Sequence, residues 1–225
     1  MKKLIAIITI LISSNFNYAQ IAVINNDAGF IEVRKDPKDN SEIIYILKND
    51  EVFVYNVSEI GSESNWNTVF ISKNKYQLEC GDAYDSNIIG YIPKDLIYPI
   101  EYLPKESKGG HISFKYKLAK FNKKNKILDF EEQQLTKING RKIYGTTGNI
   151  PTTEVIGIDA KINGNKIEIP SILYQDIFEC DNDFMINSNK DNFIIHQWNG
   201  VGPTEYLIVW VLGDGKLKQR LILKP

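Results

Sequence analysis

The sequence has few of the residues from which most catalytic and metal sites are built. Its 225 residues include only two histidines and two cysteines. The cysteines, Cys80 and Cys180, lie far apart and lack the CxxC spacing of a structural zinc site. A GxSxG nucleophile motif and a phosphate-binding glycine loop are also missing from the sequence. We therefore expect no metal ion and no cofactor, and we predict that the protein is not an enzyme.

An excess of positive charge is missing as well. Lysine and arginine residues number 27 against 28 aspartate and glutamate residues, and the formal net charge is −1. Nucleic-acid binding needs a basic surface that neutralises phosphate groups. One basic stretch, residues 115–126, places its charges on both faces of an expected strand and turn. The charge pattern therefore predicts that nucleic acid is not a partner.

Long apolar segments are missing too, and the longest one, at the start of the chain, is too short to cross a bilayer. Residues 4–12 are mostly apolar and follow Lys2 and Lys3, whereas a membrane span needs about 20 residues. A basic start, a short apolar run and a small residue before the cut are typical of a secretory signal. We predict a signal peptide over residues 1–19, export to the periplasm or the extracellular space, and no integral membrane association after cleavage. The alternative is a buried N-terminal strand or helix.

The residues that are plentiful favour β-structure. Tyrosine, phenylalanine and isoleucine are common and alanine is scarce, which favours strands over helices. Residues 104–110 combine a proline, three charges and two glycines, which is typical of a domain boundary. We therefore predict a mainly β protein with two domains, residues 20–103 and 111–225, joined by a linker over residues 104–110.

Short apolar or alternating segments separated by turn-forming residues fill the first predicted domain. Such closely spaced strands indicate a β-sandwich or a β-barrel. The expected strands are Phe30–Val33, Ile43–Leu47, Val52–Val57, Trp66–Ile71 and Gly90–Ile97.

The order of the motifs in this domain resembles the bacterial SH3-like (SH3b) domain family. The motifs that carry the resemblance are Gly29–Val33 followed by Arg34 and Pro37, the turn Lys48–Asp50, Val52 and Val54, Trp66 with Val69, and Gly90–Ile92. The stretch from Ser72 to Ile89 is longer than the usual connection in that family. The resemblance implies a small β-barrel over residues 20–103 that binds a ligand rather than transforming it.

The resemblance also implies binding through aromatic side chains on one side of the barrel. The candidate ligand-binding residues are Tyr55, Trp66 and Tyr91. Flat aromatic rings suit peptides and glycans, so the expected partner is a peptide, a cell-wall fragment or a protein. The alternative interpretation is that Trp66 and Tyr91 complete the barrel core, because such residues are highly buried on average.

The second predicted domain reads as an antiparallel β domain with one short helix. Residues 112–118 alternate between apolar and polar side chains, and the Asn-Gly pairs at 139–140 and 163–164 are strong hairpin signals. Apolar residues four apart after Pro170 predict a helix over residues 170–178. This half resembles a C-terminal domain of unknown function behind SH3-like modules in exported bacterial proteins, through residues 148–151, 169–174 and 213–215.

Cysteine chemistry and the long stretch from Ser72 to Ile89 leave further interpretations open. In an oxidising compartment Cys80 and Cys180 could form a disulfide that joins the two domains. One alternative function is an inhibitor or immunity-type protein that inserts this stretch into a secreted enzyme. Another is a cell-wall cysteine hydrolase that uses Cys180 and His196, although a cysteine after the predicted helix departs from the pattern of those enzymes.

Overall fold

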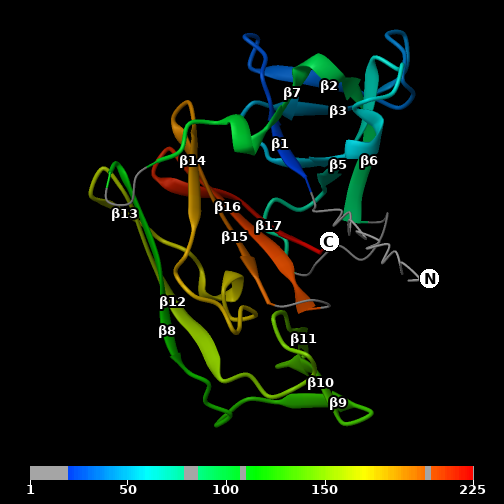
Figure 1. Ribbon diagram of the computed structural model, residues 1–225. Coiled ribbons are helices and arrows are strands. Elements are labelled where there is room, and N and C mark those ends of the chain that lie inside the picture. Colours follow the sequence, from blue (N-terminus) through cyan, green and yellow to red (C-terminus); the bar gives the residue numbers. More distant parts are fainter. Residues whose placement is uncertain (1–19, 79–85, 107–109, 201–203, 225) are drawn as a thin grey trace, which may run out of the picture.

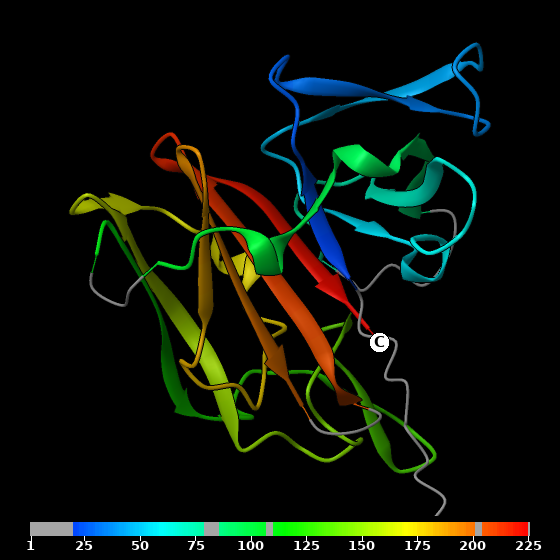
Figure 2. The same ribbon diagram turned by 45° about the horizontal axis from the view of Figure 1, so that its top comes forward.

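The computed structural model describes residues 20–78, 86–106, 110–200 and 204–224. These residues are mainly in antiparallel strands, and they contain no helix of seven residues or more. The prediction of a mainly β protein is therefore confirmed. The strands form three layers, in which one sheet lies between two others (Figures 1 and 2).

The first layer is a seven-stranded sheet in the N-terminal half. Its order is β3-β2-β6-β5-β4-β1-β7, and three 3-10 turns, η1 (Val57–Glu59), η3 (Lys94–Leu96) and η4 (Ile100–Tyr102), accompany it. Its strands are β1 (Ile21–Ile24), β2 (Phe30–Arg34), β3 (Ile43–Lys48), β4 (Phe53–Tyr55), β5 (Trp66–Ser72), β6 (Asn87–Pro93) and β7 (Ile97–Pro99).

This sheet curls strongly around its own core. Ala22 on β1 and Leu47 on β3 lie near opposite ends of the strand order, yet both belong to one buried cluster with Val69 of the middle strand β5. The two ends therefore approach each other. The sheet is nevertheless not closed by hydrogen bonds, and none of the sheets formed by the described residues closes into a barrel. The predicted SH3-like barrel is thus not confirmed.

A glycine allows strands β2 and β6 to approach each other closely. Strand β2 pairs with β6 only at Arg34 and Tyr91, and Gly90 lies directly beneath the crossing. A Cβ atom at Gly90 would lie 2.6 Å from Val33 Cγ1, 2.8 Å from the Arg34 carbonyl oxygen and 2.9 Å from Ile44 Cδ1. Only a residue without a side chain fits between these atoms.

The C-terminal half contributes the other two layers and a small additional sheet. The outer layer is ordered β13-β12-β8, the small sheet β11-β10-β9 and the central sheet β14-β15-β16-β17. Their strands are β8 (Ile112–Lys120), β9 (Leu128–Glu131), β10 (Gln134–Ile138), β11 (Arg141–Lys142), β12 (Thr153–Ile162), β13 (Asn165–Ile167), β14 (Met185–Asn189), β15 (Asn192–Asn199), β16 (Tyr206–Gly213) and β17 (Lys216–Leu223).

Both Asn-Gly pairs form the hairpin turns that the sequence predicts. Asn139 and Gly140 join β10 to β11, and Asn163 and Gly164 join β12 to β13. All four residues have positive φ angles, of 55°, 73°, 50° and 80° in chain order. Asparagine and glycine are the residues that tolerate this conformation best, so the local sequence alone determines these two turns.

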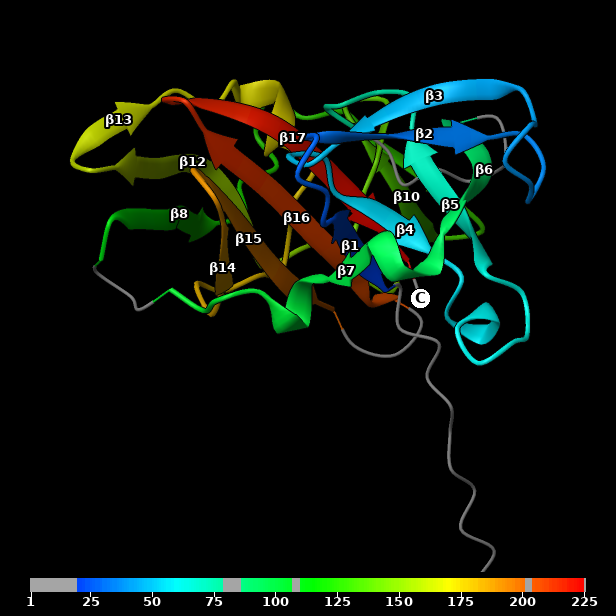
Figure 3. The same cartoon turned by 90° about the horizontal axis from the view of Figure 1, so that it is seen from above.

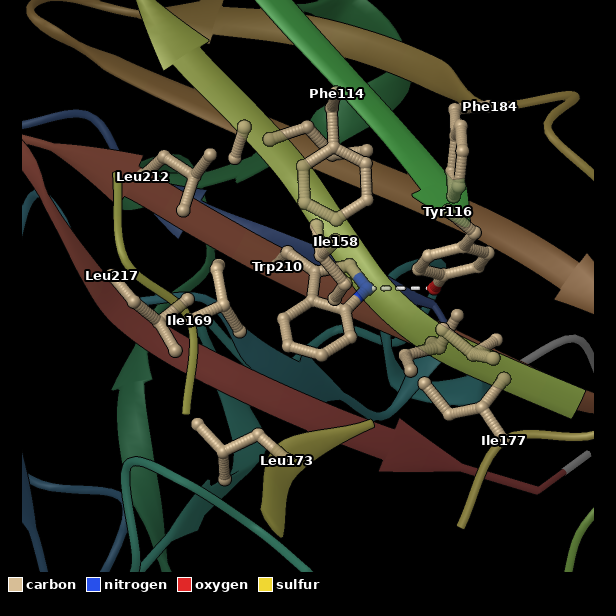
Figure 4. Packing of buried hydrophobic residues seen from close by; sticks show 14 of the residues in the cluster. Phe114, Tyr116, Ile158, Ile169, Leu173, Ile177, Phe184, Trp210, Leu212 and Leu217 are labelled. Atoms are coloured by element: carbon tan, nitrogen blue, oxygen red, sulfur yellow. Dashed lines mark hydrogen bonds between the residues drawn. The ribbon is translucent and has the colours of Figure 1, made fainter. Parts of the chain in front are cut away.

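The central sheet lies between the other two layers (Figure 3). Along β16 the side chains of Ile208 and Trp210 point into a core shared with β8 and β12, whereas Val209 and Val211 point into a second core shared with the N-terminal sheet. In the first core the Trp210 indole donates a 3.0 Å hydrogen bond to the Tyr116 hydroxyl (Figure 4). Successive side chains of a strand point to opposite faces. Strand β16 therefore packs against both halves of the chain and links them.

The predicted helix over residues 170–178 is wrong. Only Ser171–Leu173 form a 3-10 turn, η5. Ile177 then pairs with Tyr144, and Phe178 pairs with Glu154 of β12. Leu173, Ile177 and Phe178 are buried, but backbone pairing with distant segments replaces the hydrogen bonds of a helix.

Part of the predicted linker is paired rather than free. The Ser188 amide donates to the Pro104 carbonyl oxygen at 2.8 Å, and the Glu106 amide donates to the Ile186 carbonyl oxygen at 2.9 Å. Residues 104–106 thus extend the central sheet beside β14. Residues 107–109 lie outside the described residues, and the domain boundaries stay a prediction.

A buried ion-pair network fastens the segment after η5 to the central sheet. Asp176 accepts hydrogen bonds from Arg220 and from Arg141, each at 2.8 Å, and the side chains of Arg220 and Asp176 have no exposed surface. Burial raises the pKa of the Asp176 carboxyl group, and the two guanidinium groups act in the opposite direction. Arg220 also donates to the Gln77 carbonyl oxygen of the N-terminal half.

We expect Gly90→Ala to destabilise the protein by about 1–3 kcal/mol, because the new methyl group overpacks the crossing of β2 over β6. The free energy of unfolding in urea measures this. Gly61→Ala is the matched control, because no atom lies within 4 Å of a Cβ at Gly61. Equal stabilities of the two variants would contradict the close approach at Gly90.

We expect Asp176→Asn to lower the free energy of unfolding by about 3–5 kcal/mol, because the buried Arg220 charge loses its counter-ion. Glu42→Gln is the matched control, since its pair with Lys35 is 3.0 Å long but mostly exposed. That change should cost less than about 1 kcal/mol. A similar cost for both variants would show that the buried network contributes no more than a surface pair.

Candidate functional site

Two of the three predicted binding residues lie on one face of the N-terminal sheet. Trp66 of β5 is opposite Pro93 of β6, and Thr68 is opposite Tyr91, so Trp66 and Tyr91 are diagonal neighbours. The residues that alternate with them along the two strands, such as Val69 and Ile92, point into the core. Here we call this half-buried surface the outer aromatic face; it consists of Trp66, Thr68, Phe70, Ile89, Tyr91 and Pro93.

The third predicted residue, Tyr55, lies elsewhere. It is opposite Val69 on the core side of the sheet and is only 3% exposed. Its hydroxyl donates to Gln20 Oε1, and burial raises the pKa of Tyr55 to about 12. The structure therefore places Tyr55 in the core, apart from Trp66 and Tyr91, because β4 turns Phe53 and Tyr55 inward together.

Exposed apolar side chains extend the outer aromatic face across β2 and β3. Phe30, Ile43 and Ile46 are 46%, 45% and 43% exposed, and Ile43 is opposite Arg34, which in turn is opposite Tyr91. Ile43 and Ile46 stand in the continuous apolar run Ile43–Leu47, and the strand predicted there does not reveal which of its side chains are exposed. The β-bulge between β2 and β3 determines which of these side chains face outward, and it depends on strand pairing that the sequence does not reveal.

Arg34 and Glu59, two charged residues near this surface, already have partners. Arg34 Nη2 forms an ion pair with Glu32, and Arg34 Nη1 donates to the Ser41 carbonyl oxygen at 2.8 Å. At the other end, Glu59 accepts hydrogen bonds from the Thr68 amide at 2.7 Å and from its hydroxyl at 2.9 Å. These bonds hold the neighbouring turn in place. The surface therefore offers mainly flat, apolar contact area.

The residues of the alternative hydrolase are not brought together. His196 shares its face of β15 with Ile194, which belongs to the core beside the N-terminal sheet. Cys180 packs against the other core, on the opposite side of the central sheet. Burial raises the pKa of the Cys180 thiol to about 12, so the thiol is protonated at neutral pH. Its predicted partner in a disulfide, Cys80, lies outside the described residues, and the disulfide stays a prediction.

The long stretch from Ser72 to Ile89 is partly docked. Ser72 belongs to β5 and Ile89 to β6. Tyr76 between them pairs with Arg220 of β17, and its hydroxyl donates to the Leu217 carbonyl oxygen at 3.0 Å. Residues 73–78 therefore cover the edge of the central sheet, and the remainder, residues 79–85, lies outside the described residues.

Comparison with known proteins adds no relative. No family model matches the chain, and neither a curated protein nor a solved structure is significantly similar to it. Within the described ranges, no group of three or more histidine, cysteine, aspartate or glutamate side chains is placed to hold a metal ion. No helix in those ranges is long and apolar enough to cross a membrane.

We expect the His196 imidazole to titrate near pH 4 and to make stability depend on pH. Burial and the nearby Lys105 ammonium lower the pKa of His196 from 6.5 to about 4. Between these values only the unfolded chain binds the proton. The contribution of the uncharged His196 to the free energy of unfolding is thus complete above pH 6.5. As the pH falls from 6.5 to about 4, this contribution is lost, by about 3 kcal/mol in total.

Proton NMR of the two imidazole rings measures this titration directly. His111→Gln removes the exposed histidine and assigns the remaining signal to His196. Urea unfolding of the same variant at several pH values follows the change in stability. A His196 midpoint near 6.5 would contradict the burial of an uncharged ring.

Proposed function

We propose that this protein is an exported, non-catalytic binding protein that holds a peptide or a cell-wall fragment on its outer aromatic face. The observation that carries the proposal is the diagonal placement of Trp66 and Tyr91 on one half-buried surface. Diagonal residues on paired strands lie within reach of one extended ligand. Export rests on the signal predicted over residues 1–19, which lie outside the described residues.

The chemistry of the surface supports a ligand that is bound by stacking rather than by charge. Aromatic rings provide large contact area at a low entropic cost and fit the apolar faces of peptides and sugars. Arg34 beside Tyr91 is occupied by Glu32 and by the Ser41 carbonyl oxygen. A neutral peptide or glycan segment therefore suits the face better than a highly charged ligand.

The arrangement of the motifs supports an SH3-like character for the N-terminal half. Gly29 has a φ angle of 84° in the turn before β2, Trp66 and Val69 lie together on β5, and Gly90–Ile92 lies on β6 beneath the crossing of β2. The N-terminal sheet also curls around a single core, and this curl supports the proposed SH3-like character.

We expect Trp66→Ala and Tyr91→Ala each to weaken binding to purified peptidoglycan at least about tenfold, because each removes an aromatic contact worth roughly 1.5–3 kcal/mol. Co-sedimentation with insoluble peptidoglycan and calorimetry with its soluble fragments measure the affinity. Tyr102→Ala is the control, since Tyr102 is 72% exposed on η4, outside the outer aromatic face.

The proposed function is contradicted if the wild-type protein binds neither peptidoglycan nor its fragments. If the wild type binds and both variants bind equally well, the outer aromatic face is not the site. Unchanged urea unfolding of the variants separates lost contacts from lost folding.

A further inference from the structure

A cavity of about 450 Å³ lies between the N-terminal sheet and the central sheet, within the range of ligand pockets, about 300–1,000 Å³. Its walls come from β1, η4, β14, β15 and β16, so the two halves of the chain form it together. It is distant in the sheet order from β6, which carries Tyr91. Its apolar wall residues are Ile21, Ile100, Met185, Trp198 and Leu207.

His196 provides a hydrogen-bond acceptor inside this cavity. The Asn187 amide nitrogen donates to the Leu103 carbonyl oxygen at 3.1 Å, which fixes the orientation of the amide group. Its oxygen therefore faces His196 Nε2 at 3.0 Å, and that nitrogen must carry the proton. His196 is only 7% exposed, and its Nδ1 lone pair has no partner among the residues that the structure describes. A ligand with an N–H group would satisfy it.

One positive and one negative side chain also line the cavity. Lys105 is held there by its backbone bridge to Asn187 of β14, and Glu101 lies on η4. Neither side chain forms an ion pair or hydrogen bond with another described residue, unlike Arg34 and Glu32 beside the outer aromatic face. Their charges remain available to groups of opposite sign on a ligand.

We propose that this cavity binds a short peptide with free termini and apolar side chains. The peptide carboxylate pairs with Lys105, its ammonium group pairs with Glu101, and its amide N–H donates to His196 Nδ1. The apolar side chains contact Trp198 and the other apolar walls. This site is separate from the outer aromatic face, and the inference does not rest on the proposed function.

Chemically altered dipeptides test each contact without altering the protein. Calorimetry with leucyl-leucine should give saturable binding at millimolar concentration or below. Leucyl-leucine amide lacks the carboxylate, N-acetyl-leucyl-leucine lacks the ammonium group, and the N-methylated peptide bond lacks the N–H. Each derivative should bind at least about fivefold more weakly, the loss expected for a missing charge-assisted or buried hydrogen bond.

Variants of the two exposed charges assign these losses to residues. Lys105→Met should bind leucyl-leucine and its amide equally, and Glu101→Gln should bind leucyl-leucine and its N-acetyl form equally. Lys115→Met and Glu131→Gln, exposed residues of β8 and β9, are the matched controls. Trp66→Ala should leave all these affinities unchanged, which separates this site from the outer aromatic face.

The proposal is overturned if the wild type binds none of the dipeptides at millimolar concentration. It is equally overturned if the derivatives bind as tightly as leucyl-leucine, or if Lys105→Met and Glu101→Gln retain the wild-type preferences. Because both side chains are exposed, these variants should fold, and their urea unfolding verifies it.

Discussion

The arrangement of the molecule depends on one constraint, which is that β16 has no face toward solvent. All eight of its residues are buried, and alternate side chains enter two separate cores. Such a strand is stable only when a layer covers each side. The N-terminal sheet and the β8–β12 sheet supply these two layers. The two halves of the chain are therefore joined by a shared hydrophobic core as well as by the segment that connects them.

Polar residues follow the same alternation on the neighbouring strand β17. Gln219 points to the N-terminal sheet, where its side-chain amide exchanges hydrogen bonds of 2.8 and 2.9 Å with the backbone of Val52. Arg220, the next residue, points to the opposite core and meets Asp176. Buried polar groups need partners, and each of these two residues finds its partner in a different segment. These directional hydrogen bonds fix the position of each layer on the central sheet. Apolar contacts alone are not directional and define that position less precisely.

Much of the secondary structure could be predicted from local sequence because its causes are local. Asn163 and Gly164 set their own turn, and the apolar run over residues 206–212 marks a strand that is buried on both sides. The failures concern contacts between distant segments. Residues 170–178 have helical spacing, but Tyr144 and Glu154 provide backbone partners that win over a helix. Likewise, the position of Tyr55 depends on which face of β4 meets the curled core, and motif order cannot reveal that.

The two surfaces that we assign to ligands differ in what they require of the fold. Trp66 and Tyr91 stand on adjacent strands of one sheet, so their spacing is fixed by backbone hydrogen bonds within that sheet. The cavity around His196 has one wall on β1 and η4 and the other on β14–β16, so its shape depends on how the N-terminal layer sits on the central sheet. A ligand there binds only the assembled layers and must stabilise their association. A ligand on the outer aromatic face contacts a single layer and has no such effect, so the two kinds of binding are thermodynamically separable.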